Sequence, residues 1–143
     1  MMLSVFSSVV ILMSQPLDML IPPNSQVACE EATTQQAMNL CAAQEFERAD
    51  AALNAQWRRT RKVIQARDQR MRESDPKSDG RRLSDDSLLQ AQRAWLRFRD
   101  AQCRTEGFAA RGGSLEPLLV STCKTRLTTR RTEDLNQMIQ GPD

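Results

Sequence analysis

Two aspartates and an arginine are the residues of this chain that could carry out chemistry. Asp50 lies in one predicted helix, and Arg99 and Asp100 are neighbours in another. Two carboxylates can act as general acid and base when they converge in a cleft that separates their pKa values. Nothing in this spacing favours such a site. We interpret the residues as a polar clamp, in which Arg99 binds Asn54 or nearby carbonyls and Asp50 restrains the backbone amides of a loop.

The chain of 143 residues contains no histidine. Histidine is the commonest general base and a frequent zinc ligand, and without it Ser–His and Cys–His nucleophiles are impossible. We therefore expect a protein that is not an enzyme and that has no cofactor and no metal. The formal net charge of +2 is too small to indicate a nucleic-acid partner by itself, and we expect none.

The cysteines bear on the compartment in which the protein folds. The chain has four, Cys29, Cys41, Cys103 and Cys123. They fit two disulfides in an oxidising compartment, whereas in the cytosol they would be free thiols. Residues 3–13 form an uncharged apolar run, long enough for a signal peptide and too short to span a membrane. We expect residues 1–28 to be a leader, without a lipid anchor, and residues 29–143 to form one periplasmic or secreted domain.

Hydrophobic periodicity predicts an all-α fold with three main helices, at about residues 33–73, 84–109 and 114–139. Thr33-Thr34-Gln35-Gln36 has the form of a capping box for the first helix, and Ser84 with the two following aspartates would cap the second. Short loops favour antiparallel neighbours, so we expect an antiparallel helical hairpin bundle.

Aromatic side chains fall on the predicted buried stripes of two helices. Leu53 and Trp57 lie on the first, and the second carries Leu88, Ala91, Trp95, Phe98 and Gln102 at the same helical spacing. All three rings, Trp57, Trp95 and Phe98, are expected in the core. The alternative is an exposed aromatic surface for a partner, which the helical spacing does not favour.

Helix geometry ranks the cysteine pairings. If the second and third helices fold about Gly112 and Gly113, Cys103 and Cys123 lie at equal distances from the turn. If the first and second helices lie side by side, Cys41 and Cys103 would be about 18 Å apart along the helix axis. The Cα atoms of a disulfide lie within about 7 Å of each other. We therefore predict the pairs 103–123 and 29–41, the second of which requires the segment before residue 33 to fold back.

The first predicted helix is acidic at its start and basic at its end, as the helix dipole favours. Ordinary solvation of a charged face explains this pattern. A basic surface for anionic lipid, wall polymer or nucleic acid is the alternative, and it would use Arg58, Arg59, Arg61 and Lys62. The near absence of aromatic residues between these charges disfavours nucleic acid. An acidic surface for a basic partner would use either the first turns of that helix or the loop region with Asp75, Asp79, Asp85 and Asp86.

The ordered set of motifs resembles the N-terminal domain of the LprI-type lysozyme-inhibitor family over about residues 29–138. It comprises Cys29, Cys41, Asp50, Leu53-Asn54, Ala91-Gln92-Arg93-Ala94-Trp95, Phe98-Arg99-Asp100, Cys103, Gly113-Ser114 and Cys123. The family usually has an aromatic residue, often tyrosine, near Asn54, and here Trp57 takes that place. The resemblance implies an exported helical protein with a protein partner, and the namesake of the family inhibits lysozyme.

Two functions are therefore expected from different classes. The first is a binding protein that inhibits lysozyme by blocking its cleft. The second is an envelope adaptor or stress protein that uses the basic end of the first helix on membranes or cell wall.

Overall fold

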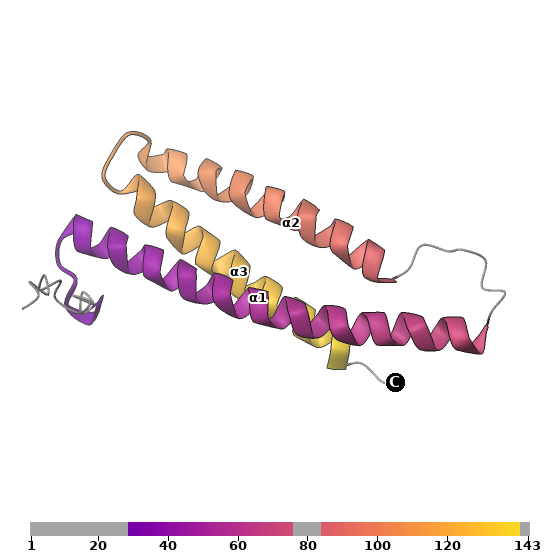
Figure 1. The fold of residues 1–143 in the computed structure, drawn as a ribbon. Helices are drawn as coiled ribbons and strands as arrows, with labels where there is room; N and C mark the ends of the chain where they lie inside the picture. The colour runs from indigo at the N-terminus through magenta and orange to yellow at the C-terminus, as the bar shows by residue number, and fades with distance from the viewer. Residues whose placement is uncertain (1–28, 76–83, 141–143) are drawn as a thin grey trace, which may run out of the picture.

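The computed structural model describes residues 29–75 and 84–140. Most of them lie in three long helices (Figure 1): α1 (Gln35–Ser74), α2 (Ser84–Gly107) and α3 (Glu116–Gln140). Two 3-10 turns complete the structure, η1 (Cys29–Glu31) before α1 and η2 (Phe108–Ala110) after α2. No strand occurs in these two ranges. The predicted all-α class and its three helices are confirmed.

The N-cap of α1 is Thr34, one residue later than in the predicted capping box. Its backbone is extended, with φ −96° and ψ 148°, and its Oγ1 accepts a hydrogen bond from Ala37 N at 3.2 Å. That bond satisfies one of the N–H groups left free at a helix start. No glycine or proline interrupts the next 40 residues, so α1 extends for about 60 Å.

The start of α2 is held by a side chain of α1. Asp68 is only 6% exposed, and its two carboxylate oxygens accept hydrogen bonds from the backbone N–H groups of Ser84 (3.3 Å) and Asp85 (3.0 Å). A carboxylate at a helix N-terminus is favoured both by these free donors and by the helix dipole. These two N–H groups are thus satisfied from 16 and 17 residues away, not by the local Ser84 side chain.

Helices α1 and α3 run parallel to each other and form the most extensive helix–helix contact (Figure 1). Thr60 Oγ1 donates to Leu135 O at 3.0 Å, Arg67 Nη1 to Met138 O at 3.2 Å, and Asn39 Nδ2 to Ser114 O at 2.9 Å. The partners are 75, 71 and 75 residues apart, a nearly constant offset that only parallel helices give. Each consecutive pair of helices is antiparallel, as predicted, so the first and third run in the same direction.

The apolar core is small and takes one leucine from each helix. Leu53, Leu88 and Leu135 are 1%, 8% and 0% exposed, and Trp57, Ile64 and Trp95 pack against them. Polar side chains fill much of the remaining interior: Gln56, Thr60, Asp68, Gln92, Arg99 and Thr128. The predicted core positions of Leu53, Trp57 and Trp95 agree with this cluster.

The prediction for Phe98 was wrong, since its side chain is 54% exposed. The buried face of α2 is formed by Leu88, Gln92, Arg99 and Cys103, with Trp95 half-buried. Moving one residue along a helix turns the side chain by about 100°, so burial of Arg99 leaves Phe98 in solvent. The polar residues occupy the inner face because partners on the other helices satisfy them.

Both predicted disulfides are confirmed. Cys103 and Cys123 join α2 to α3 with their Cα atoms 5.4 Å apart, and both side chains are almost fully buried. Cys29 and Cys41 join η1 to α1 with a Cα separation of 5.6 Å, so the segment before α1 does fold back along it. Within the described residues, no helix has the length and apolar character needed to cross a membrane.

Candidate functional site

Arg99 lies at the centre of a polar clamp between α1 and α2. Its Nη1 donates to Asp50 Oδ1 and its Nε donates to Asp100 Oδ1, both at 3.0 Å. Asn54 Nδ2 donates to the second oxygen of Asp50, also at 3.0 Å. A clamp is present at these residues, but both of its expected contacts differ. Arg99 binds the carboxylates of Asp50 and Asp100 in place of Asn54 or a backbone carbonyl. Asp50 binds the arginine and the asparagine, and the loop amide of Gly112 is bound instead by Glu116 Oε2 at 2.8 Å.

Two aromatic rings flank the same guanidinium group. Cζ of Arg99 lies 5.2 Å from the centre of the Phe46 ring and 5.4 Å from that of Trp95. A cation over an aromatic face is attracted by the ring quadrupole, and more strongly when it is desolvated. Arg99 is 7% exposed, so these contacts help to offset the cost of burying its charge. Phe46 and Thr128, which accepts from Arg99 Nη1 at 3.5 Å, are clamp residues that the sequence reasoning missed.

The clamp does not have the geometry of a carboxylate active site. Asp50 and Asp100 both bind the same cation, and their side chains are 37% and 45% exposed. A general acid and base need a cleft that desolvates one carboxyl and leaves the other ionised. The arrangement around Arg99 instead joins α1 and α2 and orients the rings beside it. No group of three or more metal-ligating side chains occurs in the part of the chain that the structure describes.

The acidic and basic surfaces proposed from the sequence partly neutralise each other. Arg61 Nε and Nη2 donate to the two oxygens of Asp85 at 2.8 and 2.6 Å, and Gln65 Nε2 adds a bond of 3.0 Å. The hydrogen bond from Arg61 lowers the pKa of Asp85, and the same bond raises the pKa of Arg61. Neither residue is a free charge for a partner, because each has formed a bidentate pair.

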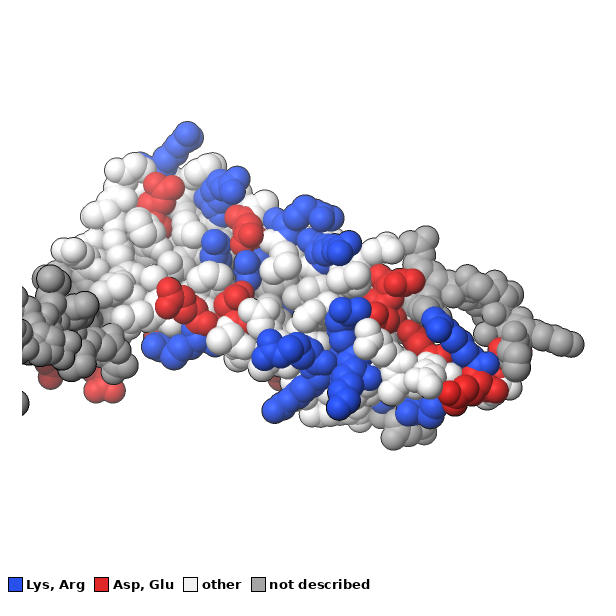
Figure 2. All heavy atoms as spheres, in the orientation of Figure 1, with Lys and Arg blue, Asp and Glu red and all other residues white. Residues whose placement is uncertain are grey.

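The other candidate charges that the structure describes are exposed to solvent. Arg58, Arg59 and Lys62 are exposed and form no ion pair with the residues that the structure describes. Asp86 is exposed in the first turn of α2, and Asp75 is exposed at the C-cap of α1. Asp79 lies outside the described residues. Figure 2 shows basic side chains over the middle of α1 and along α2, with acidic side chains between them.

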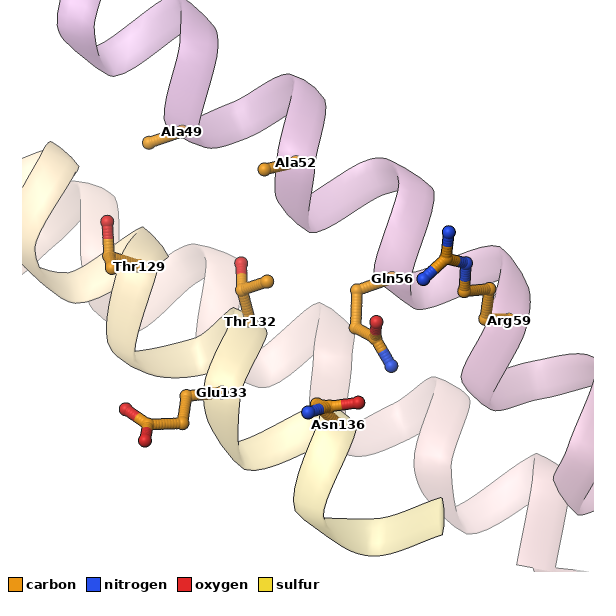
Figure 3. A pocket seen from close by; sticks show the side chains of 8 residues that line it. All are labelled: Ala49, Ala52, Gln56, Arg59, Thr129, Thr132, Glu133 and Asn136. Carbon is orange, nitrogen blue, oxygen red and sulfur yellow. The ribbon is translucent and has the colours of Figure 1, made fainter. Parts of the chain in front are cut away.

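A shallow groove of about 430 Å³ lies between α1 and α3 (Figure 3). Ala49 and Ala52 leave space on α1 opposite Thr129 and Thr132 of α3, and the polar lining is completed by Gln56, Arg59, Glu133 and Asn136. The groove offers hydrogen-bonding groups of both kinds but no nucleophile with an adjacent base. Sequence reasoning missed it, since it arises only where the parallel helices α1 and α3 meet.

Arg131 is a half-buried cation at the interface of α2 and α3. Its Nε donates to Gln92 Oε1 at 3.0 Å, its Cζ lies 6.0 Å from the Trp95 ring centre, and its buried Nη2 has no hydrogen-bond partner. Burial lowers the pKa of Arg131, although Asp134 acts in the opposite direction. Arg131 of α3 and Arg99 of α2 thus both lie near the ring of Trp95. Because Arg99 also binds Asp50 of α1, this group of contacts includes all three helices.

Comparison with known proteins agrees with this scaffold. The family described as "Lysozyme inhibitor LprI" matches residues 28–135, which is most of the chain. The chain belongs to the LprI family. An uncharacterized protein of Rhizobium meliloti (strain 1021) is 39% identical over 125 residues, covering 85% of this chain and 88% of its own length. No solved structure gives a significant match. The LprI resemblance drawn from the cysteines and the Trp95–Arg99 region is therefore confirmed.

Proposed function

We propose that this LprI-family protein inhibits a lysozyme by binding to it and blocking its substrate cleft. The observation that carries the proposal is the family match over residues 28–135, since the family is described as a lysozyme inhibitor. The fold is consistent with a rigid binding domain. The Cys103–Cys123 disulfide joins α2 to α3 and the clamp joins α1 to α2, and a preformed arrangement of helices lowers the entropy lost on binding.

Inhibition in this proposal requires no chemistry of the protein's own. The chain has no histidine, and its most buried charged groups, Arg99 and Asp68, are used in bonds between helices. A protein of this kind acts by occupying the enzyme's surface, so its activity depends on affinity alone.

We also propose that the protein is exported and acts in the periplasm or outside the cell, after loss of a leader within residues 1–28. Two disulfides persist in an oxidising compartment and are rare in the cytosol. Lysozymes act on the cell wall, so their inhibitor must reach the same compartment. Mass spectrometry of the protein recovered from the envelope would test this by locating the mature N-terminus.

Lysis assays with purified oxidised protein test the main proposal. The protein is mixed with lysozymes of several classes, and the clearing of a cell-wall suspension is followed. We expect inhibition with a dissociation constant in the micromolar range or tighter. A micromolar constant corresponds to a binding free energy of about −8 kcal/mol. Protein that has been reduced and alkylated is the control and should inhibit less. Absence of both inhibition and binding at about 50 μM, some fifty times the expected dissociation constant, would refute the proposal.

A second candidate function, an envelope adaptor that binds anionic surfaces, is supported by the exposed charges of Arg58, Arg59 and Lys62. Charge reversal at these three residues should abolish salt-sensitive binding to vesicles that contain an anionic lipid. Arg61 is left unchanged because its loss would unpair Asp85. Reversal of three other exposed arginines, Arg93, Arg97 and Arg104, is the matched control. An equal loss of vesicle binding in both variants would indicate that binding depends on the net charge of the protein rather than on this surface.

A further inference from the structure

Three of the six large hydrophobic side chains that are exposed in the described residues lie at one end of the bundle. Phe108 and Leu115, at 45% and 42% exposure, belong to the connection between α2 and α3. Leu40, at 44%, lies next to Asn39, whose Nδ2 bonds Ser114 O at 2.9 Å. In Figure 1 this connection lies at the end of the bundle where α1 begins. We call residues 108–115 the α2–α3 tip. Its apolar groups are exposed where the chain turns between two helices.

The α2–α3 tip is held from below by close packing. The disulfide between Cys103 and Cys123 joins the two helices a few residues beneath it. Gly107 is buried against Val120, and a Cβ placed there would lie 2.5 Å from Val120 Cγ2, so only glycine allows this approach. The chain therefore enters the tip at a fixed distance from α3.

The tip is also braced by its own hydrogen bonds. Gly112 has φ +76°, a conformation that other residues rarely adopt, and its N–H donates to Glu116 Oε2 at 2.8 Å. Gly113 N donates to Ala110 O at 2.9 Å, and Arg111 N donates to Phe108 O at 3.2 Å. An ordered loop of this kind loses little conformational entropy when it binds a partner.

The available charge of the tip is positive. Arg111 is exposed, and its Cζ lies 4.9 Å from the centre of the Phe108 ring. The nearby carboxylates are already engaged, since Glu106 binds Arg126 at 2.9 Å and Glu116 binds the Gly112 amide. Arginine is one of the residue types enriched among those that dominate protein–protein binding energy. The tip thus combines an apolar surface with one unpaired cation.

We propose that the α2–α3 tip is the part of the protein that enters the substrate cleft of a lysozyme; this inference rests on the proposed function. Glycosidase clefts hold two carboxylates on either side of the scissile bond, and a guanidinium group is complementary to a carboxylate. The apolar face of Phe108 would cover a sugar-binding subsite, and Arg111 would approach the catalytic carboxylates. This assigns binding to a basic tip, in place of the acidic surfaces expected from the sequence.

The decisive experiment compares two double variants with matched chemistry. Phe108→Ser/Arg111→Glu changes the tip, and Phe98→Ser/Arg97→Glu changes another exposed phenylalanine and arginine, on the side of α2. We expect the tip variant to inhibit lysozyme at least tenfold more weakly, roughly the effect of losing one binding hot spot. The α2 variant should remain within about twofold of the unmodified protein, because surface residues away from the interface contribute little. Melting temperatures of both variants are measured, and Arg111→Glu alone is made in case the double change disturbs folding.

Competition with a chito-oligosaccharide distinguishes cleft binding from binding elsewhere on the enzyme. The oligosaccharide should displace the protein from lysozyme in proportion to its own occupancy of the cleft. Unchanged inhibition by the folded tip variants, equal loss in the α2 variant, or absence of competition would each overturn the tip assignment while leaving inhibition standing. Absence of inhibition by the unmodified protein would overturn both the tip assignment and the proposed function.

Discussion

Replacement of Arg99 by methionine tests whether the polar clamp holds the bundle together. Arg99 is 7% exposed, and its guanidinium group joins α1 to α2 through Asp50, with a further bond to Asp100. It also lies over the rings of Phe46 and Trp95. Arg99→Met keeps much of the aliphatic stem and removes all the N–H donors and the charge.

The expected loss can be worked out from these contacts. Each charge-assisted hydrogen bond is taken at about 1.5 kcal/mol, the low end of the usual range, because both carboxylates keep more than a third of their surface in water. The two cation–π contacts add about 0.5 kcal/mol each. The buried end of methionine recovers about 1 kcal/mol. We therefore expect Arg99→Met to lower the free energy of unfolding by about 3 kcal/mol.

Urea unfolding of the oxidised protein, followed by tryptophan fluorescence and circular dichroism, measures this loss. Asp100→Asn is the control; its half-exposed side chain should cost less than about 1 kcal/mol. Combining Asp50→Asn with Arg99→Met should give a coupling energy of about 1 kcal/mol, since the two residues are in contact. A loss below about 1 kcal/mol for Arg99→Met would show that the clamp contributes little and that our interpretation of this motif is wrong.

Three further predictions follow from contacts between helices. Asp68→Ala removes the acceptor for the Ser84 and Asp85 amides. It should lower the free energy of unfolding by about 1–2 kcal/mol and speed hydrogen exchange in the first turn of α2. Unchanged exchange would contradict the capping role. In the folded protein the hydrogen bond from Arg61 lowers the pKa of Asp85. The stability that this pair contributes is therefore fully present above the unfolded pKa of about 3.9. It is lost as the pH falls through the lower pKa of the folded protein. The advantage of the unmodified protein over Asp85→Asn should therefore shrink as the pH falls below about 3.9, and a constant difference would refute the assignment. Replacing the Cys103–Cys123 bridge, which spans 20 residues, by two alanines should cost about 3 kcal/mol in urea unfolding, and a loss below about 1 kcal/mol would argue against its stabilising role.

Features that depend on local spacing were predictable from the sequence. The helices follow from apolar periodicity and from the positions of glycine and proline. The Cys103–Cys123 pair follows from the fixed rise of a helix on either side of one turn. The N-cap was displaced by one residue, from Thr33 to Thr34, because two neighbouring threonines carry the same hydroxyl group and local sequence does not choose between them.

The face of α2 that is buried was predicted only in part. An apolar pattern favours Phe98 in the core, yet Arg99 is buried in its place. The charge of Arg99 is accommodated because Asp50 and the ring of Phe46 approach it from α1, and Trp95 lies on the same helix. Sequence periodicity records the polarity of one helix and carries no information about partners that a neighbouring helix supplies.

The sequence by itself determined the helices, the disulfide pairs and membership of the LprI family, because each depends on residue type and on separation along the chain. Tertiary structure alone decided the parallel contact of α1 with α3, the capping of α2 by Asp68 and the pairing of Arg61 with Asp85. It also decided which charges remain available to a partner. These outcomes depend on how the helices rotate about their axes, and that rotation is set by contacts between residues far apart in sequence.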